Sequence, residues 1–351
     1  RLRHQALHDP LTGLANRTLC LDRIAQGLTR SKQRDDYVYA VLFLDLDRFK
    51  VINDSLGHAV GDLLLKEIGQ RLLGCVRGVD TVSRFSGDEF VIFLDELETP
   101  REAIAIGQAV CEAVRRPATI GSHVVQTSVS IGIVLSPADY REPEDLLQNA
   151  NIAMYKAKEA GKDRLRVFNA QMLEQAVARL QLENDLRRGI ASGEFFLVFQ
   201  PIMRLRDMSL TGFEALVRWN HPHKGVVSPN AFIPLAEETD LIVDLGRFVL
   251  ERACQVMASW RSMIPSLNDL TLSVNLSGRQ FSQPDLLETV GRALRLVDLP
   301  GNCLKLEITE TTVMENAENA VDKLRRLKAL GMVLSIDDFG TGYSSLSYLQ
   351  R

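Results

Sequence analysis

Apolar runs of strand length alternate with amphipathic stretches in the first half of the chain. The run at residues 37–44 is rich in aromatic and β-branched residues, which predicts a buried central strand that ends at Asp45. Residues 79–85 and 90–94 flank Ser86-Gly-Asp-Glu89, where Gly87 suits a backbone position with positive φ, so we expect a hairpin. A strand pair is predicted around residues 124–135. Amphipathic patterns predict helices at about residues 17–30, 62–72, 101–115 and 143–161.

The second half repeats a strand–helix alternation, which is typical of a barrel or a doubly wound sheet. Residues 169–190 are polar, lack proline and carry apolar residues at roughly helical spacing, so we interpret them as a semi-rigid helical linker. The expected division is therefore a first domain at 1–168, the linker and start of the second domain at 169–190, and the rest at 191–351. Strands are predicted at residues 195–200, 210–216, 270–276, 303–308 and 333–336.

Bulk composition narrows the class of protein. The 351 residues suggest two domains, and 46% apolar with 25% charged residues is ordinary for a soluble globular protein. The net charge of −4 argues against nucleic acid as a partner, and no apolar run is long enough to span a bilayer. The five scattered cysteines favour free thiols in a reducing cytoplasm. The chain begins with Arg1, so we expect a fragment that follows an upstream sensory region, and membrane anchoring of the parent protein stays open.

Polar groups gather at the ends of the predicted strands in the second half. A carboxylate within an apolar run is costly unless it is paired or bound to a metal ion. Acids at the ends of successive strands converge on one mouth of a barrel, where they would bind hard divalent cations. A single acid of this kind more often caps a helix or pairs with a nearby cation, but the whole set favours a metal site. The residues concerned are Glu214, Arg218, Asn275, Glu307, Glu310, Asp337 and Asp338.

The first half carries a smaller set of acids. Asp45 at a strand end, with Asp88 and Glu89 in the hairpin turn, could share one or two magnesium ions that activate a 3′-hydroxyl and steady an α-phosphate. Asn53 and Asp62 suit the Watson–Crick edge of guanine. Three lysines could neutralise a triphosphate, although each alone is more often a solvated surface residue: Lys50, Lys158 and Lys162.

Together these pieces resemble the GGDEF diguanylate cyclase family across about residues 1–168. The resemblance implies a central antiparallel sheet flanked by helices, with Asp45 and Asp88 as ligands of Mg²⁺ or Mn²⁺ and Glu89 close to the metals. It also implies that the protein joins two GTP molecules into cyclic di-GMP across a homodimer. The matching motifs are Asp9-Pro-Leu-Thr-Gly-Leu-Ala-Asn-Arg17, Asp45-Leu-Asp-Arg-Phe-Lys50, Asn53-Asp54, Gly57-His58, Gly61-Asp62, Ser86-Gly-Asp-Glu-Phe90 and Tyr155-Lys-Ala-Lys158.

Two details of this half qualify the resemblance. Arg77-Gly-Val-Asp80 matches the family's RxxD inhibitory site, where Arg77 and Asp80 would bind cyclic di-GMP, and an ordinary surface ion pair is the alternative. Ser86 replaces the first glycine of the signature, where backbone and nucleotide should approach closely. Reduced synthesis, or a GTP site that serves mainly in regulation, is therefore a second expectation for this half.

The second half is similar to the EAL phosphodiesterase family from about residue 175 onward. The resemblance implies a TIM-type barrel in which two Mg²⁺ or Mn²⁺ ions activate a water molecule that cleaves cyclic di-GMP to linear pGpG. The motifs are Phe199-Gln-Pro201, Glu214-Ala-Leu216, Arg218-Trp219, Pro229, Phe232-Ile-Pro234, Asn275-Leu-Ser277, Glu307-Ile-Thr-Glu310 and Asp337-Asp-Phe-Gly-Thr-Gly-Tyr-Ser-Ser-Leu346.

The same resemblance implies a role for each site residue. Asp338 would bind the second metal, Glu310 would support the metal shell or the loop after Asp337, and Gln200 and Arg218 would hold the substrate. His221 and His223 are interpreted as structural. The metal ligands would be Glu214, Asn275, Glu307 and Asp337.

The family continues past the Asp337-Asp338 loop with more barrel strands, a Lys that polarises water and a further metal-binding Glu. The sequence stops at Arg351, so we expect a truncated barrel that cannot complete the hydrolytic site by itself. The predicted function is cyclic di-GMP hydrolysis by the second half, with a first half that synthesises cyclic di-GMP or regulates through GTP. The alternative is a catalytically silent receptor of these nucleotides that signals through protein contacts.

Overall fold

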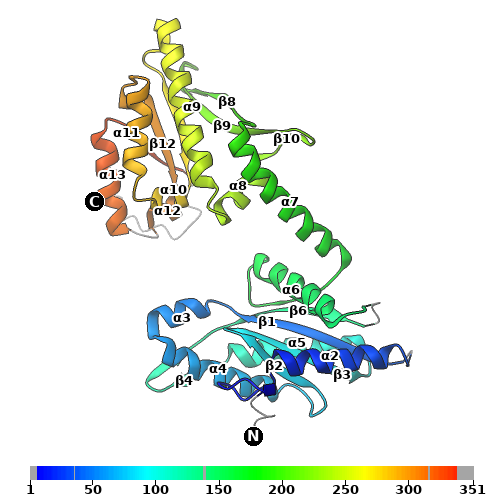
Figure 1. Ribbon diagram of the computed structural model, residues 1–351. Helices are drawn as coiled ribbons and strands as arrows, with labels where there is room; N and C mark the ends of the chain where they lie inside the picture. The colour runs from blue at the N-terminus through cyan, green and yellow to red at the C-terminus, as the bar shows by residue number, and fades with distance from the viewer. Residues whose placement is uncertain (1–5, 35, 137–139, 315–316, 338–351) are drawn as a thin grey trace. The chain divides into compact units, whose positions relative to one another are not determined.

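The computed structural model describes residues 6–34, 36–136, 140–314 and 317–337, which fold as two compact units, residues 1–178 and 179–351. The boundary lies inside α7 (Ala170–Ser192), the helix predicted as a linker (Figure 1). No helix among the described residues is both long and apolar enough to cross a membrane.

The first unit is built on a five-stranded sheet in the order β2-β3-β1-β6-β7. The central strand β1 pairs antiparallel with β3 and with β6, and β7 is parallel to β6. The predicted antiparallel sheet and hairpin are confirmed. The strands are β1 (Val38–Leu46), β2 (Thr81–Ser86), β3 (Glu89–Leu97), β6 (Val129–Leu135) and β7 (Leu165–Val167).

The predicted strand pair around residues 124–135 is wrong. β5 (His123–Val125) pairs instead with β4 (Ala118–Ile120) in a separate hairpin, and β6 joins the central sheet. The physical reason is burial, because six of the seven residues of β6 are buried and only a central position covers both of its faces.

Alternation along β1 divides the core of the first unit into two layers. Leu42 and Leu44 pack with α4 (His58–Leu73) and α5 (Pro100–Arg115) on one face. Val41 and Phe43 pack with α2 (Arg17–Ser31) and α6 (Pro143–Glu159) on the other. The short helix α3 (Phe49–Leu56), which follows β1, was not predicted. α6 approaches β6 so closely that a Cβ on Gly132 would lie 1.9 Å from the carbonyl oxygen of Ala150.

The second unit contains four parallel strands in the order β9-β11-β12-β13, and β8 and β10 are antiparallel to β9. This parallel run is the one expected of a barrel, and within the described residues it does not close on itself. The strands are β8 (Phe195–Met203), β9 (Leu210–His221), β10 (Gly225–Val227), β11 (Thr271–Leu276), β12 (Leu304–Thr309) and β13 (Val333–Asp337).

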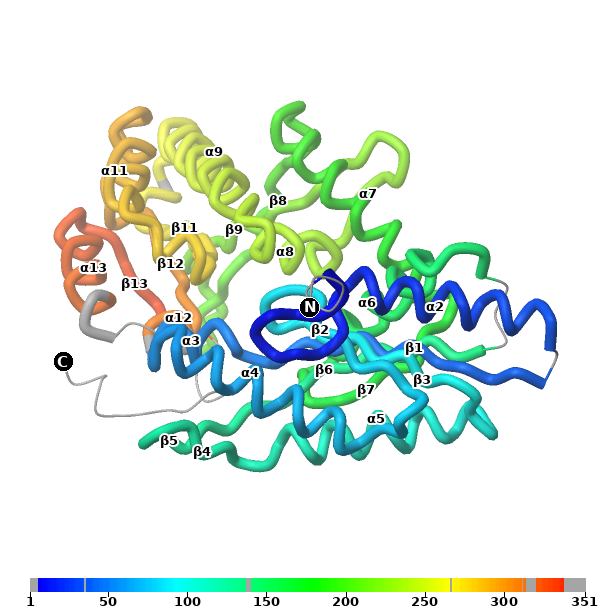
Figure 2. The backbone as a smooth tube through the Cα atoms, turned by 60° about the horizontal axis from the view of Figure 1, so that its bottom comes forward, coloured from blue at the N-terminus to red at the C-terminus, as the bar shows by residue number. Residues whose placement is uncertain are grey.

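One face of this sheet is apolar and packs against helices that follow the strands. Leu272, Val274 and Leu306 pack there with residues of α9 (Ile242–Met263), α11 (Leu286–Leu296) and α13 (Ala317–Ala329), which Figure 2 shows beside the strands. Alternation therefore points Ser273, Asn275, Lys305 and Glu307 to the opposite face. The remaining helices are α8 (Pro229–Glu238), α10 (Gly278–Ser282) and α12 (Glu310–Met314).

Four of the five cysteines are buried, Cys75 is half-buried and all are free thiols, as the scattered spacing predicts.

Candidate functional site

In the first unit the predicted metal-binding acids lie at one end of the sheet. Asp45 near the end of β1 is in register with Glu89 at the start of β3, and Asp88 lies in the turn just before it. Lys158 of α6 places its Nζ 2.6 Å from Asp45 Oδ1. The sheet therefore brings together four of the residues singled out in the sequence.

These carboxylates influence one another electrostatically. Burial raises the pKa of Asp45, and the charges of Asp88 and Glu89 raise it further, while Lys158 lowers it. Burial likewise raises the pKa of Asp88, with a further rise from Glu89 and opposing effects of its own backbone hydrogen bond and of Lys158. Like charges held in a half-buried cluster favour a site for a cation.

The hairpin turn that carries Asp88 is held by a series of contacts from Asp9 through Arg84 to Gly87, which the sequence pattern did not predict. Arg84 Nε and Nη2 donate to the carbonyl oxygen of Gly87 at 2.9 and 2.7 Å, and Arg84 Nη1 lies 3.2 Å from Asp9 Oδ1. Asp9 Oδ2 accepts from both the backbone N and Oγ1 of Thr12 at 2.7 Å. Although burial acts to raise it, the pKa of Asp9 is lowered by these hydrogen bonds and by the charge of Arg84.

Ser86 makes a specific contact at the same turn. Its Oγ donates to Glu89 Oε2 at 2.7 Å, a hydrogen bond that glycine cannot make. The residue that departs from the family signature thus binds one of the candidate site acids.

Asp47, only two residues beyond Asp45, has a structural role instead. It is buried and accepts hydrogen bonds from Ser128 Oγ at 2.6 Å, Ser130 Oγ at 2.8 Å and the backbone N of Asp163 at 3.0 Å. The carboxylate therefore ties β6 to the loop after α6. Its side chain is fully engaged within the protein.

The candidate guanine-binding residues lie on the packed helices α3 and α4. Asn53 packs against Gly61, next to the exposed Asp62, and its buried Oδ1 has no hydrogen-bond partner among the described residues. Buried amide oxygens are nearly always hydrogen-bonded, so this unpaired oxygen is unusual.

The three candidate phosphate-binding lysines lie in different surroundings. Lys158 meets Asp45, Lys50 is exposed on α3, and Lys162 lines a polar cleft of about 490 Å³ together with Arg48 and Asp47. Lys162 therefore lies beside the structural carboxylate Asp47, whereas Lys158 pairs with Asp45.

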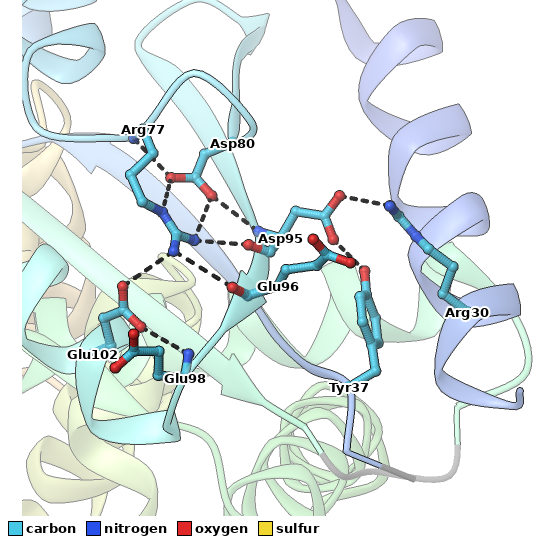
Figure 3. Close-up of polar contacts among 8 residues, drawn as sticks. All are labelled: Arg30, Tyr37, Arg77, Asp80, Asp95, Glu96, Glu98 and Glu102. Carbon is cyan, nitrogen blue, oxygen red and sulfur yellow. Dashed lines mark hydrogen bonds and ion pairs between the residues drawn. The ribbon is translucent and has the colours of Figure 1, made fainter. Parts of the chain in front are cut away.

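Arg77 and Asp80 form more than a surface ion pair (Figure 3). Arg77 Nη2 lies 3.0 Å from Asp80 Oδ1 and donates to the carbonyl oxygen of Asp95 at 2.7 Å, and Arg77 Nη1 lies 3.3 Å from Glu102 Oε1. The side chain of Asp80 is fully buried and accepts from the backbone N of Asp95 at 3.0 Å. Asp80 therefore fixes Arg77 against the end of β3.

The same cluster extends to the segment between α2 and β1. The carboxylate of Asp95 accepts from Arg30 Nη2 at 2.6 Å and from the hydroxyl of Tyr37, on the opposite side from Arg77 (Figure 3). Burial, followed by the contact with Asp95, raises the pKa of Tyr37.

In the second unit, strand register arranges the candidate ligands in rows on the polar face of the sheet. Glu214 is aligned with Ser273 across β9 and β11, and Asn275 is aligned with Glu307 across β11 and β12. Asn275 Nδ2 donates to Glu214 Oε1 at 2.7 Å. Asp337 ends β13 beside Thr309, and Asp338 lies outside the described residues.

The donor chemistry fits a hard divalent cation, because carboxylate and amide oxygens line adjacent strands. In the described part of the chain, however, no three His, Cys, Asp or Glu side chains already converge closely enough to hold a metal ion. Instead, Lys305 Nζ lies 2.9 Å from Glu307 Oε1. The sequence did not single out this lysine.

The other candidate residues surround this face. Gln200 on β8 is exposed and directly opposite Glu214, and Arg218 is half-buried with its Nη1 donating to the carbonyl oxygen of Val217 at 2.8 Å. Glu310 is buried at the start of α12, three residues after Glu307.

His221 is structural, as predicted. Its Nδ1 accepts from the backbone N of His223 and Lys224 at 3.1 and 3.2 Å, and its Nε2 contacts Asp185 Oδ2 at 3.0 Å. Because Nδ1 faces two N–H donors, the proton of the neutral ring lies on Nε2 and points to Asp185. The pair attaches α7 to the end of β9.

Comparisons with known proteins match both halves. The family model described as diguanylate cyclase, GGDEF domain, matches residues 6–164, and the EAL domain model matches residues 183–351. The bifunctional diguanylate cyclase/cyclic di-GMP phosphodiesterase MucR of Pseudomonas aeruginosa is 42% identical over 346 residues, which are 99% of this chain and 50% of MucR. The cyclic di-GMP phosphodiesterase NbdA of the same species is 39% identical over 350 residues, which are 100% of this chain and 44% of NbdA.

The chain thus spans about half the length of these curated relatives. Among solved structures, the S helix–GGDEF–EAL segment of Vibrio cholerae LapD, bound to c-di-GMP, is similar with a TM-score of 0.59 and 19% identity. That likeness covers 99% of this chain and 80% of the LapD chain, and it shows the shared fold.

Proposed function

Because this chain belongs to the family of proteins that join a GGDEF domain to an EAL domain, we propose that its second unit takes part in hydrolysing cyclic di-GMP to linear pGpG with divalent metal ions. The observation that carries the proposal is the row of oxygen donors on the polar face of β9, β11 and β12. The family relationship supports cyclic di-GMP as the substrate, and this row supplies oxygen donors for the metal ions.

In this proposal, Glu214, Asn275, Glu307 and Asp337 hold Mg²⁺ or Mn²⁺, with Asp338 at a second ion. When bound, such ions polarise a phosphoryl oxygen and lower the pKa of a bound water molecule. Arg218 and Gln200 flank Glu214 on β9 and β8, from where they hold the phosphates and orient the scissile bond. Glu310 supports the ligands from the start of α12.

We propose that the first unit binds GTP with a divalent cation at Asp45 and Asp88, with Glu89 beside it. The mutual effect of these carboxylates on their pKa values supports a cation there. Lys158, Lys162 and Lys50 would contact phosphates, and Asn53 with Asp62 would bind guanine. Synthesis of cyclic di-GMP requires two such units in a homodimer, and GTP-dependent regulation of the hydrolase requires only one.

Arg77 and Asp80 are proposed to bind cyclic di-GMP as an inhibitory site. The guanidinium is partly exposed and held in place by the buried carboxylate of Asp80. Its Nη1 makes the longer contacts, with the carbonyl oxygen of Glu96 at 3.4 Å and Glu102 Oε1 at 3.3 Å, so a phosphate would replace these two while the contacts with Asp80 keep Arg77 in position.

The experiment uses the full-length protein with Mg²⁺ and cyclic di-GMP, with and without GTP, and separates the products by chromatography. Wild-type protein should form pGpG, Glu214→Ala should not, and Glu288→Ala, which removes an exposed carboxylate of α11, should behave as wild type. Tight binding of cyclic di-GMP without pGpG would contradict hydrolysis and favour a receptor.

A further inference from the structure

The polar face of β12 contains a lysine among the candidate metal ligands. Leu304, Leu306 and Ile308 are buried in the core, so Lys305 and Glu307 point to the other face. Lys305 Nζ lies 2.9 Å from Glu307 Oε1, and the two side chains are only 27% and 13% exposed. The partly shielded ammonium therefore neutralises a carboxylate that the proposed function assigns to a metal ion.

A second unusual group lies beside this lysine. Ser273 on β11 is aligned with Glu214 on one side and with Lys305 on the other. It is fully buried, and its Oγ has no hydrogen-bond partner among the described residues. Buried hydroxyl groups are nearly always hydrogen-bonded, so this oxygen is available to a donor.

Both acceptors are within reach of the same ammonium. Neighbouring strands lie about 4.8 Å apart, and aligned residues on one face of a sheet are direct neighbours. Lysine carries its charge on a flexible four-carbon stem, so a change of rotamer can move Nζ between the Glu307 carboxylate and the Ser273 hydroxyl.

We infer that Lys305 is a positioning residue that occupies Glu307 when no cation is bound and transfers its ammonium to Ser273 Oγ when a cation binds. The exchange gives Glu307 a countercharge in the metal-free protein. It also makes Lys305 a competitor of the cation, so the pair Lys305–Ser273 sets the metal affinity. This inference rests on the proposed metal site.

The test titrates full-length protein with Mn²⁺ by calorimetry and measures the melting temperature with and without saturating Mn²⁺. Lys305→Met keeps most of the aliphatic side chain but removes the ammonium that competes with the cation. Mn²⁺ should therefore bind about fivefold more tightly, which corresponds to the free energy of a partly exposed ion pair. Without Mn²⁺ this variant should melt below wild type, and saturating Mn²⁺ should reduce that difference. A merely structural lysine would lower both melting temperatures equally.

Ser273→Ala provides an independent test that changes no charge. It removes the second acceptor, so Mn²⁺ binding should weaken by about threefold, on the scale of one modest hydrogen bond. In the Lys305→Met background the same substitution should have no effect, because no ammonium remains to be accepted. Lys305→Arg should stay near wild type, and Lys328→Met, on the exposed surface of α13, is the matched control.

The outcomes separate the inference from the function on which it rests. Unchanged Mn²⁺ affinity in Lys305→Met, or a Ser273→Ala effect that persists without Lys305, would overturn the inference while leaving the metal site intact. If wild type shows no Mn²⁺ binding that Glu214→Ala abolishes, the proposed metal site is wrong and the inference falls with it. Should Lys305→Met fail to fold, Ser273→Ala with Lys305→Arg still decides the question.

Discussion

The two units assemble similar acidic sites from opposite kinds of sheet. In the first unit, antiparallel pairing places Asp45 beside Glu89, so two adjoining strands and one turn supply every candidate metal-binding acid. In the second, each of the parallel strands β9, β11 and β12 contributes one candidate metal ligand. In both units a lysine forms an ion pair with one of these acids. The distance from Nζ to the carboxylate oxygen is 2.6 Å in the Lys158–Asp45 pair and 2.9 Å in the Lys305–Glu307 pair.

The difference concerns what fixes each site before any ligand binds. The turn that carries Asp88 is held by its own contacts, from Asp9 through Arg84 to the carbonyl oxygen of Gly87. The candidate ligands of the second unit are placed by strand register, and the hydrogen bond from Asn275 Nδ2 to Glu214 Oε1 links two of them directly. A turn mutation should therefore damage the first site, and the second should respond to changes on the polar face of the strands.

The largest expected effect separates the two sites. Asp88→Ala removes a proposed metal ligand from the first unit, so binding of GTP with Mg²⁺ should fall by about 100-fold or more, on the scale of losing a major electrostatic contact. Hydrolysis of cyclic di-GMP in the absence of GTP should be unchanged, because Asp88 lies outside the second unit. Calorimetry with GTP and chromatography of pGpG measure the two properties, and loss of both together would contradict independent sites.

Arg84→Ala tests whether the first site depends on its turn. The variant breaks the contacts to Asp9 and to the Gly87 carbonyl, and we expect the first unit to lose about 2 kcal/mol of its free energy of unfolding, on the scale of hydrogen bonds made by a charged group. Urea denaturation measures the loss, and Arg23→Ala on the exposed face of α2 is the control. Equal stability of the two variants would show that the turn holds its shape without Arg84.

Asp185→Asn tests the attachment of α7 to the second unit. The hydrogen bond with His221, followed by that with Arg188, lowers the pKa of Asp185, although burial opposes this. Stabilisation by a carboxyl group with a lowered folded-state pKa is present above about pH 4 and is lost as pH falls through the folded-state value. At pH 7 the variant should be about 1 kcal/mol less stable.

The pH dependence provides the control for that experiment. The difference between wild type and Asp185→Asn should shrink as the pH is lowered below 4, and the exposed Glu174→Gln on the same helix should show no such trend. A difference that is constant across pH would mean that the charge of Asp185 does not stabilise the attachment.

The smallest expected effect concerns Ser86. Its hydroxyl holds Glu89, which the proposed mechanism needs beside the metal ions, so Ser86→Gly should raise cyclic di-GMP synthesis by about two- to fivefold, as the loss of one modest hydrogen bond allows. Ser86→Ala removes the hydroxyl but keeps Cβ, and it separates the hydrogen bond from steric crowding. If Ser86→Ala stays at the wild-type level while Ser86→Gly rises, crowding by Cβ is the cause.

The sequence predicted the parts of the fold that depend on local pattern. The β1 strand, the β2–β3 hairpin and the alternation of strands and helices in the second half all follow from apolar periodicity and turn residues. The prediction around residues 124–135 was wrong because two strands near each other in sequence need not pair. Pairing of β6 with β1 depends on burial in the assembled sheet.

The candidate sites show the same limit. Motifs identified Asp45, Asp88 and Glu89, and the register of β1 and β3 brings this set together. Sequence did not distinguish Asp47 from Asp45, because its partners Ser128 and Ser130 lie more than 80 positions away. Lys305, Ser273 and Asp185 were missed for the same reason. The role of each depends on a neighbour that lies on another element or is brought close by strand register.

The central claim is that the second unit carries a metal-dependent phosphodiesterase site that works separately from the first. The most direct measurement incubates full-length wild type, Glu214→Ala and Asp88→Ala with Mg²⁺ and cyclic di-GMP and follows pGpG over time. We predict that wild type and Asp88→Ala form pGpG at equal rates, that chelation of Mg²⁺ stops both, and that Glu214→Ala forms none. Formation of pGpG by Glu214→Ala at the wild-type rate would contradict the claim.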